Sequence, residues 1–309
     1  NCADLRTKGW ELSLNWNDSF ALMGKRFNYT VSASLGDNKT VITKYNNPEK
    51  LLTDYYEGMV LGEIWGYRID GLFASDEEAT EYTSKINQDF VNARILSDKV
   101  EPYYRAGDLK FRDLDNNNVI NKGDDTVYDP GDREIIGNET PRYNYSFRLG
   151  ADWNGFDLGV FFQGVGKRDW YPSHLSTGFW GPYARAFTSF IPENFMDQCW
   201  SEENPGGYLP RFRGYQTFAD SQLGVNNDRY LQDASYIRLK NLTVGYTLPV
   251  LKKVFTKLRV YFTGENLWYW SPMKKYTKYI DPEAAGGNGN TGMAYNYSRN
   301  FSVGVDITF

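Results

Sequence analysis

The chain has 309 residues and a formal net charge of −5, and aromatic residues make up 17% of it although its mean hydropathy is −0.60. A pI near 5.2 gives no basic footprint for nucleic-acid binding, and a single histidine excludes multi-histidine metal sites and most histidine-based catalysis. Two cysteines are too few for a disulfide scaffold. The sequence leaves open whether Cys2 and Cys199 bond to each other, remain thiols, or whether Cys2 bonds outside this chain.

Strict alternation of apolar and polar residues recurs along the chain, and this period of two is typical of β-strands with one apolar face. Strands are predicted at residues 9–16, 26–36, 63–73, 142–153, 156–166, 241–248, 258–268 and 299–309, of which 63–73 alternates least regularly. Asn154-Gly155 between two of them predicts a two-residue hairpin turn. The sequence therefore predicts an all-β protein. An acidic run at 75–90 predicts a short helix capped by Ser75 or Asp76.

The connections between the predicted strands differ in length. Those at 153–156 and 249–257 are short, those near 74–141, 167–235 and 269–297 are long and polar, and 37–61 is too long for a simple turn. Short turns on one side and long loops on the other are typical of outer-membrane barrels, whose strands need only about 9 to 11 alternating residues. A soluble β-sandwich also alternates and also buries aromatic residues, so the pattern alone leaves both folds open.

The last predicted strand, RNFSVGVDITF, alternates without an error and ends on an aromatic residue. Its apolar positions are Phe301, Val303, Val305, Ile307 and Phe309. Because chain ends fray unless they are tied down, a strand of this regularity is expected to be held in a sheet. This favours the barrel, in which the final strand pairs with the first and leaves no edge in lipid. We expect these five side chains to face lipid.

One stretch, DLDNNNVINKGD, has the oxygen spacing of a calcium loop. Positions 1, 3, 5, 7, 9 and 12 are Asp113, Asp115, Asn117, the carbonyl of Val119, Asn121 and Asp124. Position 6 is Asn118 instead of glycine, although asparagine tolerates the left-handed conformation, and position 12 is aspartate instead of glutamate. Further ligands are available from Asp108, Asp125, Asp129 and Asp132. A structural calcium site is predicted, with a surface turn that binds nothing as the alternative.

Six stretches, given in chain order, carry a resemblance to a known family. They are GEIWGYRIDGLF, GDLKFRDLDNNNVIN, GDREIIGNETPRYNYSFRLGADWNGFDLGVFFQGVGKRDWY, YIRLKNLTVGYTLP, YFTGENLWYWS and FSVGVDITF. Together they resemble the C-terminal part of the SusC/RagA family of TonB-dependent outer-membrane transporters. The resemblance extends along nearly the whole chain.

The resemblance implies a transmembrane antiparallel β-barrel of about 22 strands, of which this chain supplies the C-terminal ones. In that family a plug fills the lumen, a TonB box couples it to the TonB–ExbB–ExbD complex, and a SusD-like surface lipoprotein covers the barrel. Residues 1–309 are then the C-terminal portion of the barrel, and 108–133 form a calcium-loop-like insertion in an extracellular loop. The plug and the missing strands are expected outside this chain.

The implied function is import of oligosaccharides or peptides across the outer membrane of a Gram-negative, Bacteroidota-like bacterium, and the sequence does not say which. A secreted calcium-binding β-domain that binds or degrades glycans is the alternative. No enzyme activity is predicted, because no second catalytic feature singles out an acid and base among the many carboxylates.

Aromatic residues crowd two of the long connections. Contact with substrate or lid is predicted for Trp170, Tyr171, Trp180, Trp200, Trp268 and Trp270. Aromatic faces stack on sugar rings and anchor protein interfaces. The alternative is that these rings pack a small core within the loops themselves.

Overall fold

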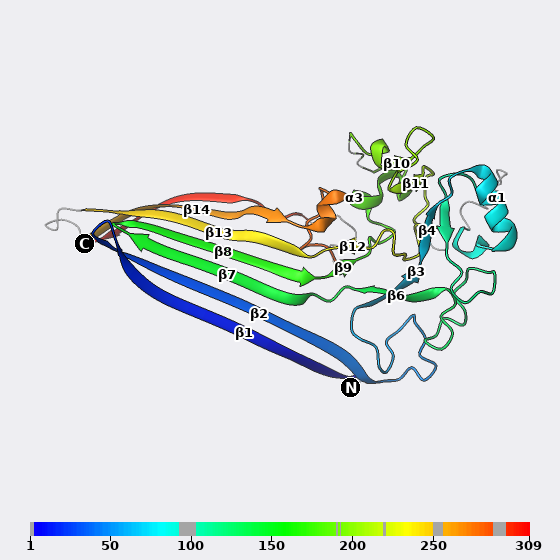
Figure 1. The fold of residues 1–309 in the computed structure, drawn as a ribbon, viewed down its shortest axis with the longest axis horizontal. Helices are drawn as coiled ribbons and strands as arrows, with labels where there is room; N and C mark the ends of the chain where they lie inside the picture. Colours follow the sequence, from blue (N-terminus) through cyan, green and yellow to red (C-terminus); the bar gives the residue numbers. More distant parts are fainter. Residues whose placement is uncertain are drawn as a thin grey trace.

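One antiparallel sheet dominates the computed structural model, which describes residues 3–92, 103–189, 191, 193–218, 221–249, 256–286 and 295–309. The sheet has seven strands in the order β1-β2-β7-β8-β13-β14-β15 (Figure 1). Their bounds are β1 (Ala3–Leu22), β2 (Lys25–Tyr45), β7 (Arg142–Trp153), β8 (Phe156–Lys167), β13 (Tyr236–Leu248), β14 (Lys257–Trp270) and β15 (Asn300–Thr308). Every neighbouring pair is antiparallel. The predicted all-β class is confirmed.

The strand predicted at 63–73 is wrong as a long strand of this sheet. It is divided into β3 (Glu63–Tyr67), which pairs with β6 (Arg133–Asn138), and β4 (Ile69–Leu72), which pairs with β5 (Leu109–Phe111). The chain changes partner at Arg68, whose guanidinium pairs with Glu134 and with Asp228. This stretch alternates poorly because it forms two short strands with different partners, so no single buried face runs along it.

Two hairpin turns of the large sheet lie at the same end. Asn154 and Gly155 have φ of +48° and +90°, as the predicted turn requires, and Met23 and Gly24 form a second turn with φ of +50° and +72°. The second turn was not predicted. Because 63–73 is no strand of this sheet, the connection from β2 to β7 is one long segment, 46–141, and it lies at the opposite end (Figure 1). The connection predicted at 37–61 is too long for a simple turn because β2 continues to Tyr45 and the residues after it belong to this long segment.

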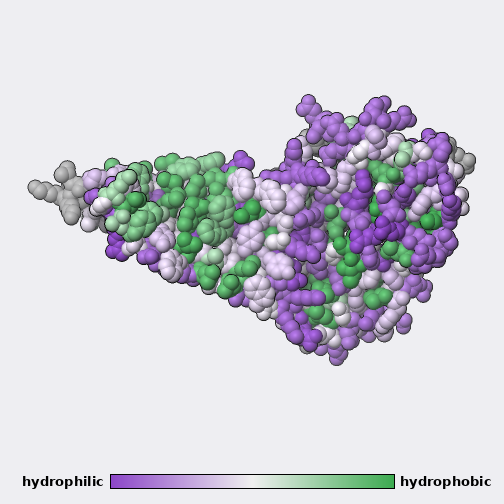
Figure 2. Space-filling model, in the orientation of Figure 1, coloured by the Kyte–Doolittle hydropathy of each residue, from purple (hydrophilic) through white to green (hydrophobic). Residues whose placement is uncertain are grey.

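The pairing register gathers the apolar positions of the strands on one face of the sheet. One row across the sheet contains Trp16, Val31, Leu149, Val160 and Leu242. A second contains Tyr29, Ala151, Leu158, Val244, Phe262 and Val303. The sheet half of the molecule carries large hydrophobic areas, whereas the other half is mainly hydrophilic (Figure 2).

The opposite face of the sheet is polar, and its side chains pair across neighbouring strands. Oγ atoms of Ser34 and Ser146 lie 2.7 Å apart. Arg259 of β14 forms ion pairs with Asp157 at 2.6 Å and with Asp306 at 3.0 Å. A sheet with one apolar and one polar face suits a wall between lipid and a wet lumen.

The long connections fold together into a second unit, called here the loop body: the described residues of 46–141, 168–235 and 271–286. It contains α1 (Asp76–Lys85), α3 (Thr177–Trp180), β9 (Asp169–Trp170), β10 (Cys199–Trp200), β11 (Leu209–Arg211), β12 (Gln232–Asp233) and the 3-10 helices η1 (Asp89–Asn92), η2 (Gly181–Tyr183), η3 (Met196–Gln198) and η4 (Pro272–Lys275), besides β3 to β6. The predicted helix is α1, and Ser75 caps it by accepting the Glu78 N–H at 3.2 Å. Among the described residues, no helix is long and apolar enough to span a membrane.

Candidate functional site in the loop body

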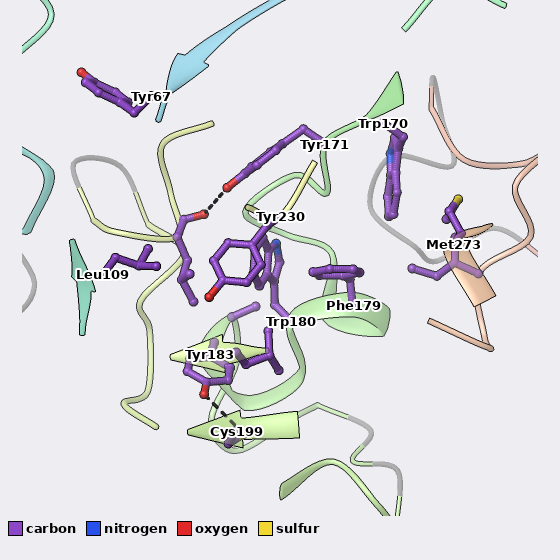
Figure 3. Packing of buried hydrophobic residues seen from close by; sticks show 14 of the residues in the cluster. Tyr67, Leu109, Trp170, Tyr171, Phe179, Trp180, Tyr183, Cys199, Tyr230 and Met273 are labelled. Carbon is purple, nitrogen blue, oxygen red and sulfur yellow. Dashed lines mark hydrogen bonds between the residues drawn. The ribbon is translucent and has the colours of Figure 1, made fainter. Parts of the chain in front are cut away.

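An aromatic core holds the loop body together (Figure 3). Trp180 is fully buried at its centre, with ring centroids 4.7 Å from Phe179 and 5.4 Å from Tyr230. Its indole N–H donates to the carbonyls of Pro172 and Ser173, at 3.2 and 3.1 Å. All three long connections contribute, since the buried cluster also contains Tyr67, Leu109, Phe111, Ile120, Met273 and Ile280. Segments far apart in sequence therefore share one core.

Three of the six aromatic residues predicted to contact substrate or lid lie in this core. Trp170, Tyr171 and Trp180 are 2%, 9% and 0% exposed. Their surroundings are those of the alternative in which the rings pack a core within the loops. Trp200 is half-buried on β10, where it packs over Gly107.

Trp268 and Trp270 lie instead on the apolar face of β14. They are exposed and in register with Leu239 and Ile237, near the end of the strand that leads into the loops. Aromatic residues at this place are typical of the interfacial girdle of a membrane barrel. Contact of Trp268 and Trp270 with substrate or lid stays a prediction.

Cys199 is a free, buried thiol. The Tyr183 hydroxyl lies 3.4 Å from its Sγ and donates to the Pro210 carbonyl at 2.6 Å. Burial raises the pKa of the Cys199 thiol, so it is held as a neutral packing group. Cys2 lies outside the described residues.

Two buried carboxylates join the long connections to their surroundings. Asp281 pairs with Arg238 of β13, and both side chains are buried. Asp108 is also buried, and Arg211 and Arg213 lie 3.1 and 3.5 Å from its carboxylate. Burial raises the pKa of Asp108 in spite of the two arginines. Asp108, the first residue of the predicted 108–133 segment, is thus engaged by arginines of another long connection and lies outside the group of carboxylates at the predicted calcium loop.

The predicted calcium loop brings together three carboxylates. Asp113, Asp115 and Asp132 each offer an oxygen, and these oxygens lie within 4.8 Å of one another. Asp132 is buried, and burial together with the charges of Asp115 and Asp113 raises its pKa. Asn118 has φ of +65°, the left-handed conformation expected at the position that glycine usually occupies. Of the extra aspartates, Asp132 is the one that joins the group.

The remaining predicted ligands are engaged within the loop. The Asn117 amide donates to Asp115 at 2.9 Å, and the Asn121 amide donates to the Val119 carbonyl at 3.0 Å. Asp124 lies outside the group of three carboxylates, and its backbone N–H donates to Asp129 at 3.1 Å.

The loop is anchored at its far side. The N–H of Ile120 donates to the Asn87 carbonyl at 2.7 Å, and the Ile120 side chain is buried in the aromatic core. Whatever orders this loop therefore also acts on the packing of the loop body.

A polar cleft of about 490 Å³ lies beside β3 and β6. Its lining comes from four segments and includes Tyr56, Glu63, Trp65, Arg133, Glu139, Ser173, His174 and Asn226. Tyr171, one of the aromatic residues predicted to contact substrate or lid, also lines it. The other lining residues were not predicted, because no two of these segments share a motif and only folding brings them together.

Comparison with known proteins agrees with this architecture. No family model matches the chain. Two TonB-dependent receptors of Formosa agariphila, P26 and P3, are each 27% identical to it over its whole length, which covers 30% and 29% of theirs. Among solved structures, the RagAB peptide transporter superposes with a TM-score of 0.63 at 20% identity over 100% of this chain and 30% of that one. The closed-closed state of the RagAB peptide importer gives 0.64 at 21% identity, covering 100% and 30%.

The fold is thus that of a section of outer-membrane β-barrel wall with its long connections. The chain is similar to TonB-dependent receptors, and the resemblance predicted from its sequence is confirmed. It spans less than a third of the length of the relatives it matches.

Proposed function

We propose that this chain is the C-terminal portion of a TonB-dependent importer that takes up oligosaccharides or peptides together with a SusD-like surface lipoprotein. The observation that carries the proposal is the large sheet, whose apolar positions share one face while polar side chains pair on the other. The relatives are named as TonB-dependent receptors, and RagAB is a peptide importer.

In the proposed transporter the missing strands, the plug and its TonB box come from the rest of the same protein. The TonB–ExbB–ExbD complex then supplies energy. The short turns face the periplasm and the loop body faces outward in the outer membrane of a Gram-negative, Bacteroidota-like cell. Support comes from the placement of turns and loops at opposite ends of the strands.

The function is tested by uptake in the native host. Cells lacking the gene, or lacking TonB, should lose growth on the cognate oligosaccharide or peptide, and the complete gene should restore it. Growth that is independent of both TonB and the gene on every candidate nutrient would contradict the proposal. Fractionation tests the secreted alternative, which requires the protein in the medium, without heat-modifiable migration. The exposed apolar face of β1 and β15 speaks against that alternative.

We also propose that the loop at 108–133 binds a structural calcium ion through Asp113, Asp115 and Asp132, with oxygens of Asn117, Val119 and Asn121 nearby in sequence. Calcium prefers six to eight oxygen ligands, and a divalent cation would relieve the repulsion among three neighbouring carboxylates. Asp124, the predicted last ligand, would need to move to take part, because Asp132 occupies that role in this arrangement.

Replacing Asp113 and Asp132 by asparagine should lower calcium affinity at least tenfold, since each change removes a charged ligand. Elemental analysis and calcium titration of the complete protein give the measurement. Asp197→Asn is the matched control, because Asp197 is an exposed aspartate of the loop body outside residues 108–133 and outside the group of three. If the complete wild-type protein carries no metal at millimolar calcium, the loop is a surface turn only.

A further inference from the structure

The polar cleft beside β3 and β6 has a floor of side chains that fix one another. The Trp65 indole N–H donates to the Tyr56 hydroxyl at 3.3 Å, and that hydroxyl donates to the Glu63 carboxylate. The other Glu63 oxygen accepts the Val60 N–H at 2.9 Å. Because Tyr56 is 6% exposed, this chain of hydrogen bonds is shielded from water and holds its rings in place. The floor is therefore formed before any ligand arrives.

The guanidinium of Arg133 forms one wall of the cleft, and its neighbours hold it in one orientation. Arg133 donates to the carbonyls of Pro130 and Lys122, at 3.1 and 3.0 Å, and pairs with Asp125 at 2.6 Å. These contacts restrict its rotation, so that a ligand group in the cleft would meet a donor of fixed direction.

The other walls carry polar groups that can form further hydrogen bonds. Within the described part of the chain, the Ser173 hydroxyl is buried with no hydrogen-bond partner, and the exposed Glu139 carboxylate has neither a hydrogen bond nor an ion pair. Asn226, which also lines the cleft, donates its side-chain amide to the Trp65 carbonyl at 3.2 Å.

The backbone edges of the strands beside the cleft are engaged at one end of each strand. β3 pairs with β6 on one side, and on the other the N–H of Tyr67 donates to Asn226 and its carbonyl accepts the N–H of Asp228, at 2.9 and 3.1 Å. On β6, the N–H of Asn138 is taken by Asp169 at 2.9 Å. An extended peptide gains much of its affinity by adding a strand to a free edge, and the engaged residues shorten the edge available here. This favours recognition by the side chains of the cleft.

We propose that this cleft is a binding site for a neutral oligosaccharide, which deepens the proposed import function and rests on it. Side chains that both donate and accept, a fixed guanidinium and a half-buried indole match the many hydroxyls and the apolar ring faces of a sugar. Glu139 accepts hydrogen bonds from sugar hydroxyls, and Trp65 contacts a ring.

The test uses the complete transporter, purified in detergent, and oligosaccharides released from starch, laminarin and xylan, with tryptic peptides of casein as the second panel. Glu139→Gln should weaken binding of the cognate oligosaccharide about tenfold, because a hydrogen bond to a charged group is lost. Trp65→Ala should weaken it at least as much. Glu202→Gln is the matched control, an exposed carboxylate of the loop body outside the cleft, and it should bind like the wild type.

Binding of the oligosaccharide that is equally tight in Glu139→Gln, Trp65→Ala and the wild type overturns the cleft as its site. If only peptides bind, and the same variants weaken that binding, the assignment to sugars is wrong. If no member of either panel binds, the proposal is wrong. Uptake experiments distinguish failure of this proposal from failure of the import function. If cells carrying Glu139→Gln import the nutrient normally, the cleft is not the binding site, and the import function is unaffected. If wild-type cells show no TonB-dependent uptake, the import function itself is wrong.

Discussion

Val303→Arg is expected to destabilise the complete barrel by about 2 to 4 kcal/mol, the cost of an arginine on the lipid face near the middle of the membrane. Val303 is 76% exposed on β15 and lies in register with Phe262, in a row of apolar side chains that continues across the sheet. In this chain the residue is open to solvent, so the cost arises only if lipid covers that face.

Ser302→Arg is the matched control, because Ser302 is the preceding residue of the same strand and points to the polar face opposite Thr263. Its arginine would enter the lumen and should change stability little. The measurement is the heat-modifiable gel shift and the urea midpoint of the folded, complete protein in lipid vesicles. Equal effects of the two substitutions would mean that the two faces of β15 meet the same medium, and the membrane assignment would lose its support.

The strands of the large sheet could be predicted because the alternation of apolar and polar residues is visible within each strand, whichever strands it pairs with. Their partners could not, since the register that joins Val31 to Leu149, or Val160 to Leu242, depends on contacts between distant residues. The error at 63–73 has the same origin: β3 and β4 are short strands of the loop body that pair with different partners, and the sequence did not show where the partner changes.

The candidate sites also differ in how much of each could be predicted from the sequence. The spacing of Asp113 and Asp115 is local and was visible in the sequence, whereas Asp132, which meets them in space, could be named only as one of several nearby aspartates. Of the cleft only Tyr171 was among the predicted contact residues, because Trp65, Glu139 and Ser173 come from different segments without a shared motif. Aromatic residues in loops proved ambiguous, since the same tryptophan can meet a ligand or a core.

Trp180→Ala is expected to destabilise the loop body by about 3 to 5 kcal/mol, as is usual for loss of a buried tryptophan. Trp180 is fully buried, and its indole N–H satisfies two backbone carbonyls, which the alanine would leave without that donor. The sheet does not depend on this core, because its strands pair through their own backbone ladders. We therefore expect a barrel that assembles and keeps its gel shift while its loops open.

The opening should be seen as new protease cleavage and faster hydrogen exchange within 168–235 of the complete protein. Phe187→Ala, at a ring that is 89% exposed in the same connection, should change protection little. Loss of ligand binding or lipoprotein association in Trp180→Ala together with this loss of protection would show that Trp180 acts by holding the loops in shape. If binding is lost while protection and exchange stay at the wild-type level, the indole contacts the ligand or the lid directly, and the core described for the loop body is not the one that forms in the transporter.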